Sequence, residues 1–129
     1  FLVQKALPHL KTSPAAAVLN MSSIGAFQFA PFVSMYAAGK SALLSFTRSM
    51  AAAYAADGIR VNAIAPGPVD TDMVRNNPQP MIDAMASNTL MKRLANPDEL
   101  VGAALLLCSG AGSYITGQVV IVDGGGTPR

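Results

Sequence analysis

The sequence has few of the residues that build several common kinds of site. It contains one cysteine, one histidine and no tryptophan in 129 residues. A single cysteine excludes a disulfide within the chain, and one cysteine with one histidine, Cys108 and His9, cannot form a Cys/His zinc site. Cys108 follows a run of alanine and leucine, so we expect it to be a buried structural thiol.

Charge is scarce as well. Only 12% of the residues are charged, and the formal net charge is +2. Such a small and scattered charge gives no argument for binding nucleic acid or a membrane surface. No apolar run reaches the ~20 residues of a membrane span, and no signal peptide is visible, so we expect a cytoplasmic protein. The chain has no initiator methionine and opens within a helical pattern, which suggests that residue 1 is not the natural start.

Hydrophobic residues, in contrast, make up 51% of the chain, which suits the buried core of one domain. Short apolar runs predict strands over 15–21, 59–65 and 118–122. Helical patterns alternate with these runs, and they cover residues 1–12, 35–56, about 79–88 and 97–108. We expect Ser34 and Asn96 to cap two of these helices. The alternation favours an α/β fold in which a parallel sheet carries helices on both faces.

Three polar side chains suggest a reaction. Tyr36 and Lys40 lie four residues apart on a predicted helix and therefore share one face. An ammonium beside a phenol favours the phenolate, so Lys40 should lower the pKa of Tyr36 from its ordinary ~10. Ser23, after a predicted strand, can hold a substrate oxygen. Together the three suit the interconversion of a carbonyl and a secondary alcohol, with a nicotinamide carrying the hydride.

Each residue also has an ordinary structural interpretation. The Tyr36–Lys40 pair could be a helix-start aromatic residue and a solvated charge. Ser23 could simply cap a backbone group in a loop, and Thr71 could cap the following helix. Asn62 is better explained as a structural hydrogen-bonding residue, and Arg93 as a surface charge.

The chain as a whole resembles the short-chain dehydrogenase/reductase family. The resemblance rests on four blocks in the family's order: residues 20–23 (Asn-Met-Ser-Ser), the Tyr36-x-x-x-Lys40 pair, residues 61–71 with a Pro-Gly turn, and residues 114–125. The spacing to Tyr36 selects Ser23 rather than Ser22. The resemblance implies a Rossmann-like doubly wound parallel sheet, of which this chain is the C-terminal portion: the last three strands and their flanking helices.

The resemblance also implies roles for particular residues. Ser23, Tyr36 and Lys40 would be catalytic, and Tyr36 and Lys40 would also contact the cofactor, NAD or NADP. The turn at Pro66 and Gly67, with the Val69 backbone and the Thr71 hydroxyl, would hold the nicotinamide carboxamide. Residues 1–12 and 35–56 match helices that the family uses for subunit pairing, so a dimer or homotetramer is expected.

Several parts of the family pattern are absent from the sequence. No Gly-rich phosphate loop is present, nor the residue that selects NAD or NADP. We therefore expect residues 1–129 to be the C-terminal catalytic part of one Rossmann-like domain, inactive alone and lacking the Gly-rich cofactor half. The alternative is a non-catalytic binding or assembly module that keeps the remnants of the fold.

The substrate region is the least regular part. Residues 73–95 are predicted to form a lid, and ordinary helix packing is the alternative explanation for its methionines. An aromatic cluster with Met35 either lines the substrate pocket or belongs to the core. The residues in question are Met73, Met81, Met85 and Met91 in the lid, and Phe27, Phe29 and Phe32 in the cluster. These apolar residues favour an uncharged small-molecule carbonyl or alcohol, with sugars, steroids and acyl thioesters all open.

Overall fold

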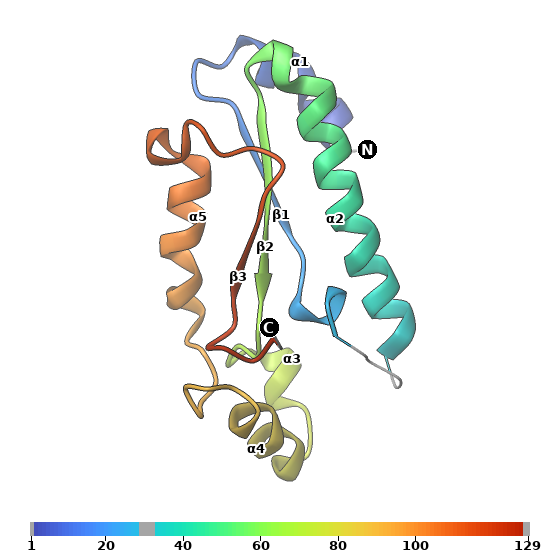
Figure 1. Ribbon diagram of the computed structural model, residues 1–129, viewed down its shortest axis with the longest axis vertical. Helices are drawn as coiled ribbons and strands as arrows, with labels where there is room; N and C mark the ends of the chain where they lie inside the picture. Colours follow the sequence, from blue (N-terminus) through green and yellow to red (C-terminus); the bar gives the residue numbers. More distant parts are fainter. Residues whose placement is uncertain (1, 29–32, 128–129) are drawn as a thin grey trace.

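The computed structural model describes residues 2–28 and 33–127, which fold around a three-stranded parallel sheet (Figure 1). The strands are β1 (Ala17–Met21), β2 (Arg60–Pro66) and β3 (Val119–Val122), in the spatial order β1-β2-β3. Val18 lies opposite Val61, and Pro66 lies opposite Val122. All three predicted strands are confirmed, with ends within two residues of those expected.

Helices cover both faces of this sheet, as the alternating pattern predicted. Figure 1 shows α1 (Leu2–Thr12) and α2 (Ser34–Tyr54) along one side and α5 (Val101–Cys108) along the other. Two short helices, α3 (Asp72–Arg75) and α4 (Gln79–Ser87), lie beyond the carboxyl end of β2. The described residues also contain the short 3-10 helices η1 (Ile24–Ala26), η3 (Ala55–Asp57), η4 (Pro97–Leu100) and η5 (Gly110–Gly112).

The central strand β2 carries the core. Its residues Val61, Ala63, Ile64 and Ala65 are fully buried, as expected of a parallel strand covered on both faces. Met50 and Ala51 of α2 pack with Val61 in one cluster, against which Leu7 of α1 is placed. Burial of this apolar surface, at roughly 25 cal/mol per Å2, is the main force that holds α1 and α2 on the sheet.

Strand β1 is different, because it pairs with β2 alone among the described residues. Its last residue, Met21, is 47% exposed. The free side of β1 therefore presents unpaired backbone groups beside an apolar surface.

Asn62 ties β2 to the segment before β3. Its side chain is 1% exposed, donates to the Ile115 carbonyl at 2.8 Å and accepts from the Gln118 N–H at 3.0 Å. The structural role expected for Asn62 is therefore confirmed.

Of the two helix caps expected from the sequence, the one at Asn96 is confirmed and the one at Ser34 is not. Asn96 accepts from the Asp98 N–H, and Glu99 reaches back to the Asn96 N–H, so the expected cap is a complete capping box. The expectation for Ser34 was wrong. Val33 has the non-helical backbone of a cap, with φ −133° and ψ 35°, and makes no side-chain cap bond, while Ser34 is already helical.

The expectation of a buried Cys108 was also wrong, since its thiol is exposed. Helix α5 is apolar on all sides and turns Leu107, 1% exposed, toward the sheet. Consecutive residues on a helix point about 100° apart, so Cys108 faces outward. Across residues 2–28 and 33–127, no helix is both long enough and apolar enough to span a bilayer.

Candidate active site

The segments that carry the predicted site leave the same edge of the sheet. Met21 ends β1 beside Ile64, and Pro66 ends β2 beside Val122. In a parallel sheet all carboxyl ends meet at one edge, where ligands of open α/β folds bind. Ser23 and the turn at Gly67 follow directly, so the topology brings them to this edge.

Ser23 begins the turn η1. Its backbone is extended, and its hydroxyl oxygen accepts from the Gly25 N–H at 3.1 Å. The capping role that sequence reasoning kept open for Ser23 is thus present. A hydroxyl that accepts one bond keeps its own proton for a second partner, so capping leaves Ser23 able to donate to a substrate oxygen.

Gly25 brings Ser23 and Tyr36 together. A Cβ placed on Gly25 would lie 3.4 Å from Tyr36 Cε1 and 3.5 Å from Ser23 Oγ. The Tyr36 ring and the Ser23 hydroxyl therefore both lie next to the Gly25 Cα, although they come from different elements. Tyr36 remains 44% exposed, so its ring is open to solvent on the other side.

Lys40 lies one helical turn after Tyr36. Its Nζ is 5.6 Å from the centre of the Tyr36 ring and donates to the Met21 carbonyl at 2.8 Å. An ammonium has three N–H donors, so this bond fixes its position and leaves two for other partners. Ser22 belongs to a different environment: it is 4% exposed and its hydroxyl donates to the Lys40 carbonyl at 3.1 Å.

The Pro-Gly turn is held against the end of β3. Gly67 donates to the Val122 carbonyl at 2.9 Å, and a Cβ on Gly67 would lie only 2.7 Å from Asp123 Cα. No residue other than glycine fits there without moving backbone. Glycine at this position is therefore a packing requirement.

The two residues predicted to hold a carboxamide follow this turn. Val69 is 8% exposed, and its N–H makes no hydrogen bond to an acceptor in residues 2–28 or 33–127. Thr71 occupies the cap position of α3, but its hydroxyl makes no cap bond and instead donates a long hydrogen bond, 3.4 Å, to the Val69 carbonyl. The Val69 N–H thus has no acceptor among the described residues, and the Thr71 hydroxyl is only weakly engaged.

Most of the apolar residues named for the predicted lid and the aromatic cluster are exposed. Met73, Met81 and Met91 are 75%, 50% and 63% exposed, so helix packing does not explain these three, whereas Met85 on α4 is half-buried and ordinary helix packing still explains it. Phe27 and Met35 are exposed too, which argues against a core role, while Phe29 and Phe32 lie outside the described residues. The predicted helix in this segment is confirmed as α4, and the lid itself stays a prediction.

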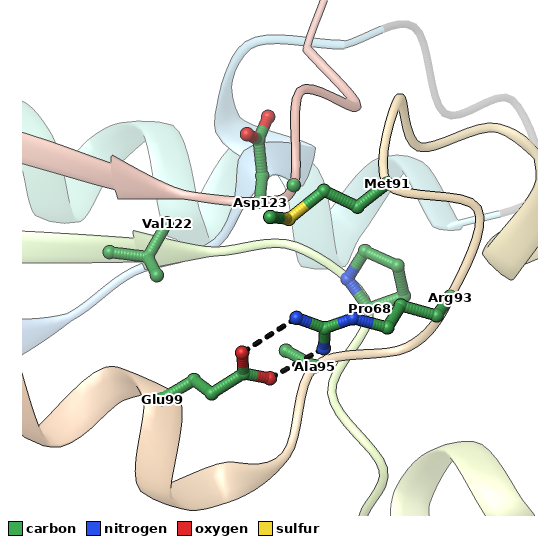
Figure 2. Close-up of a pocket in the computed structure, with 8 residues that line it drawn as sticks. Pro68, Met91, Arg93, Ala95, Glu99, Val122 and Asp123 are labelled. Carbon is green, nitrogen blue, oxygen red and sulfur yellow. Dashed lines mark hydrogen bonds and ion pairs between the residues drawn. The ribbon is translucent and has the colours of Figure 1, made fainter.

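Sequence reasoning missed how Arg93 is used. Its guanidinium makes two bonds, of 2.6 and 2.7 Å, to the carboxylate of Glu99 (Figure 2). These bonds, with the Asn96 N–H, lower the pKa of Glu99 from its ordinary 4.5 to about 2. Glu99 lies six positions after Arg93, which is not the three- or four-residue spacing of neighbours on a helix, so no sequence pattern signals the ion pair.

Two cavities of the described residues lie outside the three-residue site. One of about 70 Å3 is lined by Pro68, Met91 and Asp123 among others (Figure 2). The other, about 420 Å3, lies at the amino ends of the strands, beside Arg60 and Gly58. Neither cavity is lined by Ser23, Tyr36 or Lys40.

Comparison with known proteins gives the same family. The family described as Enoyl-(Acyl carrier protein) reductase matches residues 1–127. General stress protein 39 of Bacillus subtilis is 41% identical over 97% of this chain and 43% of its own length. Cis-4-hydroxycyclohexanecarboxylate dehydrogenase of Sinomonas cyclohexanicum is 41% identical over 95% of this chain and 49% of its own length.

Solved structures agree in fold. A 3-oxoacyl-[acyl-carrier protein] reductase of Brucella melitensis with bound NAD is 36% identical, with a TM-score of 0.83 over 96% of this chain and 45% of that one. ElxO with NADP bound is 28% identical, with a TM-score of 0.85 over 96% of this chain and 51% of that one. The chain thus spans about half the length of the proteins it matches. Because the family model covers residues 1–127 and similar structures share the parallel sheet, the chain belongs to the short-chain dehydrogenase/reductase family.

Proposed function

We propose that this chain supplies the catalytic part of an NAD(P)-dependent oxidoreductase that interconverts a carbonyl and a secondary alcohol. The observation that carries the proposal is the meeting of Ser23 Oγ and the Tyr36 ring at Gly25, with Lys40 Nζ 5.6 Å from that ring. A hydroxyl donor, a phenol and an ammonium gathered at one edge are the groups that proton transfer to a carbonyl oxygen requires.

In this proposal each group has a separate task. In the reducing direction, Ser23 donates a hydrogen bond to the carbonyl oxygen, and Tyr36 gives its phenolic proton to that oxygen. Lys40, fixed by Met21, holds a positive charge near the ring and stabilises the phenolate that remains. The nicotinamide, when bound, supplies the hydride. In the oxidising direction Tyr36 takes the proton back.

The cofactor-binding role is supported by donors at this edge that are free or weakly engaged. The Val69 N–H lacks an acceptor among the described residues, and the Thr71 hydroxyl donates only a long hydrogen bond of 3.4 Å to the Val69 carbonyl. An amide N–H beside a hydroxyl suits a carboxamide, as expected for Pro66, Gly67, Val69 and Thr71. Lys40 keeps two N–H donors for ribose hydroxyls. Both NAD and NADP occur in similar structures, and we leave the choice open.

We infer that the substrate is an uncharged carbonyl compound or secondary alcohol. The described surface beyond the strand ends is rich in exposed apolar side chains, among them Met73, Met81 and Leu90. The basic groups of this segment are engaged: Arg75 with Asp70, Arg93 with Glu99, and Lys92 with the Ser87 carbonyl. An apolar region with its cations occupied favours a substrate without a carboxylate of its own.

Subunit pairing through α1 and α2 remains part of the proposal. Phe46 of α2 is 54% exposed although it lies on a long helix beside the core. An aromatic side chain in this position suits a helix–helix contact between copies in a dimer or homotetramer.

The substitution Tyr36→Phe in the full-length protein tests the proposed function. Loss of the phenolic proton should reduce carbonyl reduction by roughly 10²–10⁴-fold, the usual contribution of a general acid. Tyr114→Phe is the matched control, because Tyr114 is fully exposed and should leave the rate unchanged. A Tyr36→Phe protein that keeps near-original rates with NADH and NADPH would refute the assignment. A wild-type protein that binds cofactor but reduces no carbonyl would favour the non-catalytic alternative.

A further inference from the structure

The chain after β3 closes into a turn that the carboxylate of Asp123 holds together. One carboxylate oxygen accepts from the Gly125 N–H at 2.8 Å, and the other accepts from the Thr127 N–H at 2.7 Å. Gly124 and Gly125 have positive φ of 61° and 82°, a backbone that side chains disfavour. We refer to residues 123–127 as the Asp123 turn.

The first of three contacts made by the Asp123 turn is with the Pro-Gly turn. Gly67 packs so closely on Asp123 that a Cβ on Gly67 would lie 2.7 Å from Asp123 Cα and 2.8 Å from its Cβ. The Gly67 N–H also donates to the carbonyl of Val122, the residue before Asp123, so the position of Gly67 is coupled to that of the Asp123 backbone. Gly67 begins the segment that contains Val69 and Thr71, the two residues proposed to hold the nicotinamide carboxamide.

The Asp123 turn also holds the end of the predicted lid. The Met91 N–H donates to the Gly124 carbonyl at 3.1 Å, and a Cβ on Gly125 would lie 2.7 Å from Leu90 Cδ1. Figure 2 shows Met91 and Asp123 beside the same cavity, on segments that face each other. Residues 90–91 are thus fixed by the shape of the Asp123 turn.

A third contact reaches the segment after Ser23. Gln28 Nε2 donates to the Gly126 carbonyl at 3.0 Å. One short turn therefore contacts the Pro-Gly turn, the lid end and the serine loop, which lie far apart in the sequence.

We propose that Asp123 is a positioning residue for the reaction, acting through Gly67, Met91 and Gln28 to set the mutual placement of the three loops around the site. The inference rests on the proposed function. It adds a residue that does not itself touch the reacting atoms. The hydrogen bonds of its carboxylate fix the backbone conformation of the Asp123 turn. The contacts of that turn then fix the positions of the three loops.

A carboxylate is required because both of its oxygens must accept. Partial burial raises the pKa of Asp123, but hydrogen bonding by Thr127 and by the Gly125 N–H outweighs it, and the pKa is lowered overall. The group is therefore ionised at neutral pH. Asparagine offers one acceptor and one amide donor, so Asp123→Asn would place an NH2 group against a backbone N–H.

The main test is Asp123→Asn in the full-length protein. We expect kcat/KM to fall roughly 10- to 100-fold, since a small misplacement of catalytic groups can cost about 10²-fold. KM for the carbonyl substrate and KM for the coenzyme should both rise, because the lid end and the Pro-Gly turn are both displaced. Asp98→Asn, on an exposed residue at the start of η4, is the matched control.

Amide hydrogen exchange gives a readout independent of activity. Asp123→Asn should speed exchange at Gly67 and Met91, while Met50 and Val61 in the core exchange as in wild type. If exchange and melting temperature change but kcat and both KM values per folded molecule do not, Asp123 is merely structural and the inference is overturned. If wild type shows no oxidoreductase activity, the proposed function fails, and exchange alone still tests whether the turn orders the loops.

A pair of glycine variants separates the effect of displacing the lid end at Leu90 from the effect of backbone strain in the Asp123 turn. Gly124→Ala and Gly125→Ala both place a side chain at positive φ. The new Cβ at position 124 would lie 3.5 Å from Met91 Cβ, an ordinary contact, whereas the new Cβ at position 125 would lie only 2.7 Å from Leu90 Cδ1. Only Gly125→Ala pushes on Leu90. We expect it to raise the substrate KM several-fold more than Gly124→Ala. Equal effects of the two variants on KM would contradict transmission through the lid end.

Discussion

Lys40 Nζ donates to the carbonyl oxygen of Met21 at 2.8 Å, so the helix that carries Tyr36 is fastened to the end of strand β1. The bond crosses from the sheet to α2 at the point where the proposed reaction takes place. It positions the ammonium through the backbone of a neighbouring element, independently of any bound ligand.

Replacing Lys40 with methionine should therefore remove both a charge and an anchor. For Lys40→Met we expect kcat/KM to fall by roughly 10²-fold, comparable to the loss of one preorganised electrostatic contact, together with weaker coenzyme binding. Steady-state kinetics and nicotinamide fluorescence titration measure the two effects. Lys11→Met is the control, because Lys11 pairs with Asp57 at the far end of α2. Retention of full activity in Lys40→Met would remove Lys40 from the site.

The two adjacent serines should behave in opposite ways. Ser23→Ala removes a donor from the site and should lower kcat by roughly 10²–10³-fold, a kinetic loss far larger than the modest loss of stability expected from removing its cap on the Gly25 N–H. Ser22→Ala removes a buried hydroxyl bonded to the Lys40 carbonyl and should cost about 1 kcal/mol of stability. Kinetics and chemical denaturation of both variants check this. A larger kinetic defect in Ser22→Ala than in Ser23→Ala would reverse the assignment.

Glycine at position 67 should be required for stability. Gly67→Ala places a Cβ 2.7 Å from the Asp123 backbone, and overpacking of this kind costs about 1–3 kcal/mol. Gly102→Ala is the matched control inside α5, since nothing lies within 4 Å of its new Cβ. That change should stabilise the protein by about 0.5–1 kcal/mol through helix propensity. Melting temperatures that move in the same direction for both variants would contradict the packing argument.

The Arg93–Glu99 pair predicts a pH dependence of stability. The pKa of Glu99 falls from 4.5 to about 2 on folding, so its contribution is fully present above 4.5 and disappears as the pH falls toward 2. Wild type and Glu99→Gln should therefore differ in denaturant midpoint at neutral pH and converge in acid. Arg93→Gln should abolish most of the same dependence, because Arg93 is the main cause of the shift. A difference that stays constant over this pH range would exclude Glu99 as its source.

Features that depend on neighbouring residues were predictable from sequence. The capping box at Asn96 and Glu99 lies within four residues, and the four-residue spacing of Tyr36 and Lys40 fixes a shared helix face. The three strands followed from short apolar runs, because a parallel strand buried on both faces has no polar alternation.

Features that depend on tertiary placement were not predictable. Cys108 was misplaced because an all-apolar helix does not reveal which side meets the sheet. The contact of Gly67 with Asp123 joins two strand ends far apart in the sequence, and only the register of β2 and β3 brings them together. An aspartate before three glycines signals a local turn, but not what that turn touches.

The outward-facing thiol of Cys108 has a practical consequence. It is the one cysteine of the chain and ends α5, on the opposite side of the sheet from α2 (Figure 1). A maleimide fluorophore attached there would sit away from Tyr36 and Lys40. In the full-length protein, with Cys108 as the labelled thiol, energy transfer between that dye and a reduced nicotinamide would then report coenzyme occupancy while leaving every proposed site residue untouched.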